Sequence, residues 1–213
     1  MGIYVFNADY LYQLLDEDLA NPASSHDFGK DVIPRAVAEG RALAHSFSKS
    51  CIVNPNGAPP YWRDVGTLDA FWEANLDLTR VVPELNLYDE SWPVLGRQPT
   101  RPPAKFVFDD VGCRGTAVDS LVSAGCIVSG ATVRRSILFH GVKVAEGSLI
   151  EDSVVLPNAS IGRGVTLHRT IIDKRCVVPD GFSAGVNPER DRARLHVTER
   201  GVCLVTPQML GHR

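Results

Sequence analysis

The turn Tyr61-Trp-Arg-Asp-Val-Gly-Thr67 contains the residues of this chain best suited to binding a metal ion. Asp64 is a hard oxygen ligand between aromatic residues and a Val-Gly-Thr turn, so its carboxylate can point into a cleft. The same residue can instead be the N-cap of a helix, because a helical pattern begins at Leu68. Trp62 can border a sugar pocket or pack in a core. The residue types leave both pairs of alternatives open.

Five further side chains could do chemistry. His26 and Asp27 are a catalytic pair by residue type, but their place ahead of a predicted helix also fits the turn at its start. His140 and His168 could each supply the base that a hexapeptide acyltransferase uses. Their positions in the repeat described next predict surface residues instead. Arg163 is also an exposed position of that repeat, where a lone arginine is usually solvated.

A 17-residue repeat over residues 118 to about 182 must position several of these side chains. The aliphatic positions within each repeat are six, six and five residues apart. An α-helix would repeat every three to four residues and a strand every two, so the pattern predicts a coil with three short flat sides. Such coils bury their apolar rows by stacking. The residues that recur are Gly130, Gly147, Gly164 and Gly181, then Leu121, Leu138, Val155 and Ile172, then Ile127, Val144, Ile161 and Val178, then Val133, Ile150 and Leu167.

This repeat resembles the hexapeptide motif of left-handed parallel β-helices, in which an aliphatic residue opens each hexad. We expect the four glycines to share one corner, because corners need a positive φ that glycine adopts without steric cost. Cys176 falls in an inward position, which predicts a buried thiol. Acyltransferases, sugar nucleotidyltransferases and structural domains all use this coil, so it does not by itself define a function.

Residues 1 to 80 mix strand-like and helix-like patterns, which predicts the C-terminal part of an α/β nucleotidyltransferase domain with a Rossmann-like fold. The segment Met1–Phe6 predicts a buried strand without a lead-in, so we expect Met1 to lie inside a longer sequence. Residues 42–53 predict one or two strands around Phe47 and Ile52.

Helices are predicted in the same region after Asn7, which is a suitable N-cap, at residues 32–37 and at residues 68–78. Residues 81–117 are rich in proline and predict a linker. Residues 118–213 then form the β-helix domain with a C-terminal extension.

Composition limits the classes of function. The chain has 213 residues, of which 44% are hydrophobic and 22% charged, and its net charge of −3 argues against nucleic-acid binding. No segment approaches the roughly 20 apolar residues of a membrane helix, and no secretory signal is visible. The five cysteines are scattered and form no C-x-x-C pair, which favours a reducing cytoplasm.

The turn around Asp64 resembles the metal-binding turn of bacterial glucose-1-phosphate adenylyltransferases (ADP-glucose pyrophosphorylases). A C-terminal left-handed β-helix is also the arrangement of that family, and the resemblance covers nearly the whole chain as the C-terminal half only. The other matching blocks, in the same order, are Met1-Gly-Ile-Tyr-Val-Phe6, Ser25 to Asp31, Asn75-Leu-Asp-Leu78, Val82-Pro-Glu-Leu85, Pro103-Ala-Lys-Phe-Val107 and Leu121-Val-Ser-Ala-Gly125.

The resemblance implies that Asp64 is the second carboxylate on Mg²⁺, and that ATP and glucose 1-phosphate are the substrates of a complete homotetrameric enzyme. It places the triphosphate loop, the first metal-binding Asp and the Glu-Lys pair at the sugar phosphate in an N-terminal half that this chain does not contain. No complete catalytic set is therefore expected here, and the chain alone is predicted to be an inactive fragment. Trp62 and Asp27 stay as candidates for substrate binding.

Arg163 matches a position where the family binds sugar-phosphate activators. The other effector arginines near the C-terminus are not reproduced, since Thr206 is followed by Pro207 and Gln208. The resemblance therefore does not imply a response to any particular effector.

Two other functions remain open at this point. The chain can be a non-catalytic regulatory or assembly module that partners a full-length subunit. It can also be a free-standing acyltransferase, which is the weaker alternative, because the turn around Asp64 has no place there and neither His140 nor His168 is predicted to be buried at an interface.

Overall fold

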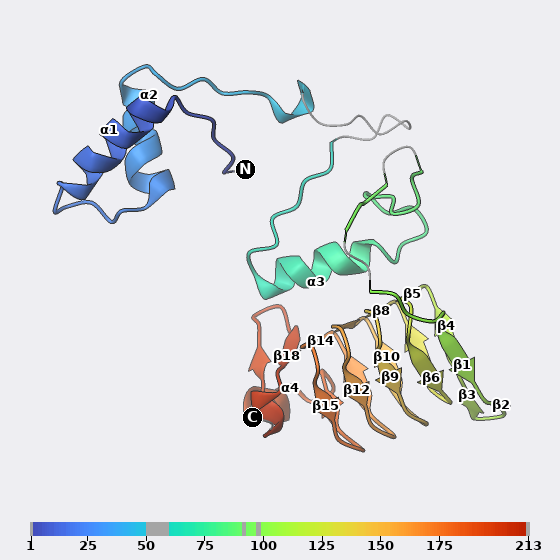
Figure 1. The fold of residues 1–213 in the computed structure, drawn as a ribbon. Helices are drawn as coiled ribbons and strands as arrows, with labels where there is room; N and C mark the ends of the chain where they lie inside the picture. The colour runs from blue at the N-terminus through green and yellow to red at the C-terminus, as the bar shows by residue number, and fades with distance from the viewer. Residues whose placement is uncertain (1, 50–59, 91–92, 97–98, 212–213) are drawn as a thin grey trace. The chain divides into compact units, whose positions relative to one another are not determined.

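The computed structural model describes residues 2–49, 60–90, 93–96 and 99–211 (Figure 1). The chain divides into two compact units, Met1–Pro60 and Tyr61–Arg213. The domain boundaries expected near residues 80 and 118 stay predictions, and two features of the structure bear on where the parts of the chain pack. The helix that follows Thr67 packs on the β-helix, and strands form within the segment predicted as a linker.

The first unit is helical in its described residues. Helix α1 (Ala8–Leu19) starts at Asn7, whose side chain accepts a hydrogen bond from the backbone of Tyr10 as predicted. A π-helical turn, η1 (Phe28–Val32), runs into α2 (Ile33–Ala38). The buried residues Leu14, Val32 and Ala36 form the core of this unit.

The strand predictions in this unit are wrong where the structure describes them. Gly2–Phe6 forms no strand, and Phe47 begins a 3-10 turn, η2 (Phe47–Lys49). An extended segment becomes a strand only when another strand supplies hydrogen bonds, and the described residues of this unit contain none. The predicted strand around Ile52 lies outside the described residues.

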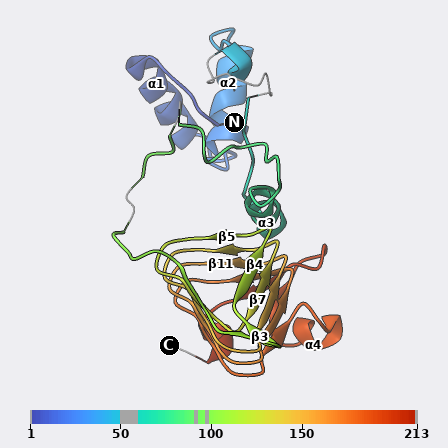
Figure 2. The same ribbon diagram turned by 90° about the vertical axis from the view of Figure 1, so that its right-hand side faces the viewer.

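The second unit is a parallel β-solenoid, consistent with the left-handed β-helix that the repeat resembles. Figure 1 shows its strands stacked in order, and Figure 2 shows successive coils overlying one another. The first side is the sheet β1 (Lys105–Val107), β6 (Ile127–Ser129), β9 (Lys143–Val144), β12 (Ser160–Ile161) and β15 (Val177–Val178). The second side is β4 (Thr116–Val118), β7 (Thr132–Arg134), β10 (Leu149–Glu151), β13 (Thr166–His168) and β16 (Ser183–Ala184).

The third side ends in a hairpin that closes the coil. It contains β5 (Leu121–Val122), β8 (Ile137–Leu138), β11 (Val154–Val155), β14 (Thr170–Ile172) and β18 (Cys203–Val205), with β17 (His196–Val197) antiparallel to β18. The remaining elements are the hairpin β2 (Asp109–Asp110) and β3 (Cys113–Arg114), α4 (Pro188–Arg192) and the 3-10 turn η3 (Gln208–Leu210).

The four repeated glycines share one corner, between the first and second sides, as predicted. All four have a positive φ, between 52° and 72°. The backbone N–H of Gly147 donates to the carbonyl of Gly130 at 2.9 Å, so the corner is stacked as well as aligned. Added side chains at Gly164 and Gly181 would meet no atom, so the need for glycine there is conformational.

The predicted register is wrong by one residue in the first coil. Val128 lies in the inward row beside Val144 and is fully buried, whereas Ile127 is 37% exposed. Val122 likewise replaces Leu121 beside Leu138. The corner after β6 is one residue shorter than its successors, so the step is 16 residues there and 17 afterwards.

A column of buried hydroxyl groups crosses the coils beside the corner between the second and third sides. The backbone N–H of Ser136 donates to Ser120 Oγ at 3.1 Å, that of Ser153 to Ser136 Oγ at 3.0 Å, and that of Thr170 to Ser153 Oγ at 3.1 Å. Each coil therefore satisfies a buried donor of the next one.

Helix α3 (Leu68–Asp77) packs on the third side of the coil. Its residues Phe71, Trp72 and Leu76 contact a buried cluster that contains Val154 and Ile171. This packing places the turn that precedes α3 in the same compact unit as the β-helix.

Candidate functional site

The turn Tyr61–Thr67 leads directly into α3. Its conformation shows which of its residues is the N-cap of that helix. Thr67, not Asp64, is the N-cap, because Thr67 Oγ1 accepts the backbone N–H of Ala70 at 3.2 Å. Asp64 Oδ1 instead accepts the backbone N–H of Gly66 at 3.0 Å. The N-cap alternative for Asp64 is therefore wrong, since its side chain closes a tight turn three residues before the helix cap.

The carboxylate of Asp64 is exposed and keeps one oxygen free. Oδ1 is engaged by Gly66, and Oδ2 has no partner in the described part of the chain. One free carboxylate oxygen fits a Mg²⁺ ion that takes its remaining ligands from water and substrate phosphates. Among the described residues, Asp64 belongs to no group of three or more acidic, histidine or cysteine side chains with the spacing of a metal site.

Two neighbours border this turn. Arg63 forms a 2.8 Å ion pair with Glu84, which ties the turn to the segment after α3. Trp62 is 49% exposed and has no ring partner among the described residues, so its surface is open to a ligand. Tyr61 is partly buried, and this burial raises the pKa of its hydroxyl group.

Asp27 lies in the first unit and begins the turn η1. Its Oδ1 accepts the backbone N–H of Lys30 at 2.9 Å, which is the N-cap arrangement that its position ahead of a helix predicts. His26 pairs with Asp18 rather than with Asp27, at 3.0 Å between Nδ1 and Oδ2. The hydrogen bonds from Ser24 and then His26 lower the pKa of the Asp18 carboxyl group.

His26 and Asp18 line an open groove of about 310 Å³ together with apolar side chains that include Leu15 and Phe28. The sequence does not predict this pairing, because the seven residues between Asp18 and His26 follow no helical or strand period. No nucleophile accompanies the pair in the lining of the groove.

Arg163 is exposed, as predicted, but it is not free. Its Nε lies 2.9 Å from Glu146 Oε2, and its backbone N–H donates to Asp180 Oδ1 at 2.7 Å. An anion that binds the guanidinium group of Arg163 would have to compete with Glu146.

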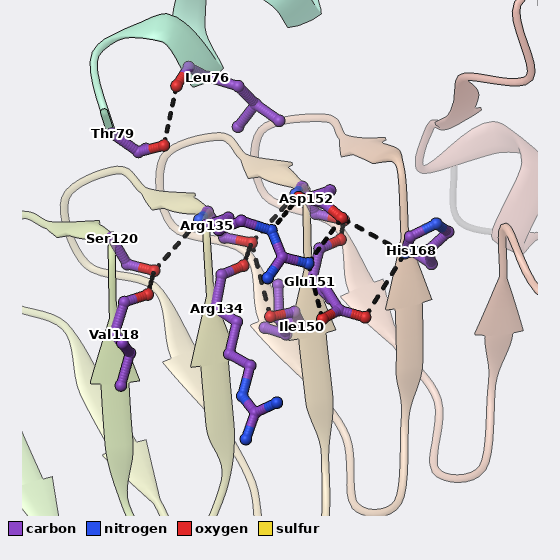
Figure 3. Close-up of polar contacts among 12 residues, drawn as sticks. Leu76, Thr79, Val118, Ser120, Arg134, Arg135, Ile150, Glu151, Asp152 and His168 are labelled. Atoms are coloured by element: carbon purple, nitrogen blue, oxygen red, sulfur yellow. Dashed lines mark hydrogen bonds and ion pairs between the residues drawn. The ribbon is translucent and has the colours of Figure 1, made fainter. Parts of the chain in front are cut away.

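An ionic cluster lies on the second side of the β-helix and at its next corner (Figure 3). Ligand atoms of Glu151, Asp152 and His168 lie within 4.8 Å of one another, which is a spacing that a cation could use. Arg135 already fills this space, since it contacts Glu151 at 2.8 Å and Asp152 at 2.7 Å. These contacts raise the pKa of Arg135 further, so the cluster is an ion-pair network and not a vacant cation site.

Three side chains of the repeat can be compared with their predicted positions, and the first, His140, is half-buried rather than fully exposed at the corner after β8. His168 pairs in register with Arg134 through Glu151, which confirms the outward position predicted for it. Cys176 is fully buried as predicted, and its burial raises the pKa of the thiol to about 11. The cysteines that the structure describes form no disulfide.

No helix among the described residues is long and apolar enough to cross a membrane.

Comparison with known proteins defines the class. Residues 1–81 match the family model described as nucleotidyl transferase. Residues 102–205 match the model described as GlmU-like, C-terminal hexapeptide. The chain is thus built like the nucleotidyltransferases that carry a hexapeptide β-helix.

Several curated relatives are similar over the whole chain. The glucose-1-phosphate adenylyltransferase of Nitrosospira multiformis is 56% identical over 213 residues, which are 100% of this chain and 50% of that protein. Those of Nitrosomonas europaea and Methylobacillus flagellatus are 57% and 58% identical over 99% of this chain and 49% of each relative. The chain belongs to the glucose-1-phosphate adenylyltransferase family. It spans about half the length of the curated relatives it matches, consistent with a C-terminal half.

Proposed function

We propose that this chain is the C-terminal portion of a glucose-1-phosphate adenylyltransferase that serves glycogen synthesis. The complete enzyme would join ATP and glucose 1-phosphate into ADP-glucose with release of pyrophosphate. The observation that carries the proposal is the similarity of all 213 residues to the Nitrosospira multiformis relative, together with the free Oδ2 of Asp64 at an exposed turn.

In this reaction a phosphate oxygen of glucose 1-phosphate attacks the α-phosphorus of ATP, and pyrophosphate leaves. Bound Mg²⁺ would neutralise the charge that develops on the phosphates. Asp64 would hold the ion through Oδ2, while Gly66 keeps the carboxylate oriented through Oδ1. Trp62 and Asp27 remain proposed contacts of the substrate, and Arg163 remains a proposed contact of a phosphate effector.

We further propose that the chain alone does not turn over, because positioning and charge stabilisation require all the phosphate-binding parts at once. The apolar side chains that the first unit exposes support this proposal. Val5 is 98% exposed and Leu43 is 100% exposed, as expected for a unit that completes its core with further polypeptide. A homotetramer in the cytoplasm is the assembly and compartment that we propose for the complete enzyme.

The test joins this chain to the half of the Nitrosospira multiformis relative that it does not cover, and follows pyrophosphate release with ATP and glucose 1-phosphate. We expect activity from the joined protein and none from residues 1–213. Asp64→Asn should lower the rate of the joined protein at least ~100-fold, or about 2.7 kcal/mol. The matched control, Asp9→Asn on α1, should leave it within about twofold. Turnover by the 213-residue chain alone would contradict the fragment proposal.

The alternative of a non-catalytic module makes a different prediction. Such a chain would alter the activity of a full-length subunit when the two are mixed, and Asp64→Asn would not change that effect. An acyltransferase role is weaker still, because His168 faces the carboxylates of Glu151 and Asp152 at 3.7 Å on an outward position.

A further inference from the structure

A contact between the C-terminal hairpin and α3 joins residues that are 129 positions apart. Thr198, in the turn between β17 and β18, donates its hydroxyl hydrogen to Asp69 Oδ1 at 2.7 Å. The same Oγ1 accepts the backbone N–H of Val202 at 3.0 Å. A carboxylate oxygen accepts, so the one hydroxyl hydrogen of Thr198 goes to Asp69, while a lone pair of the same hydroxyl oxygen receives the Val202 N–H.

Asp69 lies in the first turn of α3, two residues after the cap Thr67 that ends the Asp64 turn. The first turn of a helix is its weakest part, because its backbone N–H groups lack partners within the helix. Here Thr67 satisfies one of them, and Asp64 fixes the Gly66 amide just before it. A partner that holds Asp69 therefore also restrains the turn that carries Asp64.

The rest of α3 is held by other contacts with the β-helix. Trp72 Nε1 donates to the carbonyl of Asp152 at 2.7 Å, and the Arg169 guanidinium group lies 4.5 Å from a Trp72 ring centroid. Arg200, two residues after Thr198, forms an ion pair with Glu73. These contacts locate the body of the helix. At its N-terminal turn, Leu68 packs on the same apolar cluster, and the Thr198–Asp69 bond adds a polar contact with fixed direction.

We propose that Thr198 is a positioning residue for the candidate metal-binding turn, which it holds through Asp69. The inference rests on the proposed function for the role of Asp64. In this arrangement the hairpin β17–β18 restrains the motion of the turn Tyr61–Thr67, and that turn carries the free carboxylate oxygen of Asp64. Loss of the hydroxyl group leaves α3 docked through Trp72 and releases only its first turn.

The first experiment measures amide hydrogen exchange by NMR in the 213-residue chain. The amides of Gly66, Ala70 and Phe71 report the turn and the helix start, since they donate to Asp64 Oδ1, Thr67 Oγ1 and the Thr67 carbonyl. We expect Thr198→Val and Asp69→Ala each to speed exchange at Ala70 and Phe71 by ~10-fold and to shift the Gly66 resonance. The double variant should exchange no faster than either single variant.

Two control variants separate positioning from general loosening. Thr198→Ser keeps the hydroxyl group and should behave like the parent. Thr79→Val removes the hydroxyl that bonds the Leu76 carbonyl at 2.8 Å at the far end of α3, and it should leave Gly66, Ala70 and Phe71 unchanged. Parental exchange at Ala70 and Phe71 in Thr198→Val would overturn the proposal.

The second experiment uses the joined full-length protein and titrates Mg²⁺. Thr198→Val should raise the half-saturating Mg²⁺ concentration at least ~3-fold while the KM for glucose 1-phosphate stays within about twofold. An unchanged Mg²⁺ dependence would overturn the link to Asp64. If the parent joined protein makes no ADP-glucose, the proposed function fails instead, and exchange at Gly66, Ala70 and Phe71 still decides whether Thr198 orders the turn.

Discussion

The two compact units of this chain bury apolar side chains to very different extents. Among the described residues, the core of the first unit consists of Leu14, Val32 and Ala36, while the core cluster of the β-helix contains 20 buried residues. The first unit meanwhile leaves Ile3 80% exposed and Val5 98% exposed. The second unit exposes some apolar residues too, such as Val111, but they lie outside its continuous central rows.

The difference follows from how each unit finds its contacts. In the β-helix the coils from β4 to β16 stack on one another at separations of 16 or 17 residues, so the neighbours that a buried side chain needs are close in the sequence. A layered α/β unit must instead collect strands from distant segments. A repeat can therefore complete its core over a short stretch of chain, and a non-repetitive unit of similar length cannot.

The largest effect that we expect breaks the inward row of the β-helix. Val128→Asp would bury an unpaired carboxylate beside Val144 and should destabilise the β-helix by at least ~4 kcal/mol in guanidinium unfolding. The control, Ile127→Asp, changes the adjacent outward residue and should cost less than about 1 kcal/mol. If Ile127→Asp destabilised the β-helix more than Val128→Asp, Ile127 would be the inward residue, as the 17-residue step predicts.

The next effect separates the two units. Leu14→Ala removes a large side chain from the small core of the first unit and should cost about 2–5 kcal/mol there. Limited proteolysis should then cleave the first unit faster, while the β-helix stays resistant. Leu19→Ala, at a position that is 74% exposed, should change neither rate. If Leu14→Ala made both units equally more sensitive to the protease, the two units would unfold together rather than independently.

A smaller effect tests the hydroxyl column within the β-helix. Ser153→Ala would leave the buried N–H of Thr170 without its acceptor and should cost about 1–3 kcal/mol. Ser160→Ala is the control, because the Ser160 side chain makes no hydrogen bond among the described residues. The measurement is thermal unfolding. If Ser153→Ala and Ser160→Ala had the same midpoint, the hydroxyl column would not stabilise the β-helix.

The smallest effect concerns the exposed ion pair of the β-helix. Arg163→Gln breaks the contact with Glu146, but the arginine side chain is 73% exposed, so the loss of stability should stay within ~0.5 kcal/mol. The pKa of the Glu146 carboxyl group is lowered first by the backbone N–H of Glu146 itself and then by the hydrogen bond from Arg163. Any stability from this pair should therefore be present near neutral pH and fade as the pH falls through the lowered pKa. A loss above 1 kcal/mol at neutral pH would contradict this reading.

Local patterns in the sequence determined much of this protein. The 17-residue step predicted the solenoid, the shared glycine corner and the buried Cys176, and the capping preference of Asn7 predicted the start of α1. These features depend on residues that are near one another along the chain. Nearby residues contact one another in most conformations of a short segment, so their spacing carries the information.

Only the tertiary structure decided the contacts between distant segments. The shortened corner that moves Val128 into the core, the hydrogen bond from Trp72 to Asp152 and the bond from Thr198 to Asp69 have no local signature. The bonds of Thr67 to Ala70 and of Asp64 to Gly66 are local, but the residue types alone left the choice of cap open. Contacts between distant segments depend on how completed elements pack, so their partners are set only once the fold has formed.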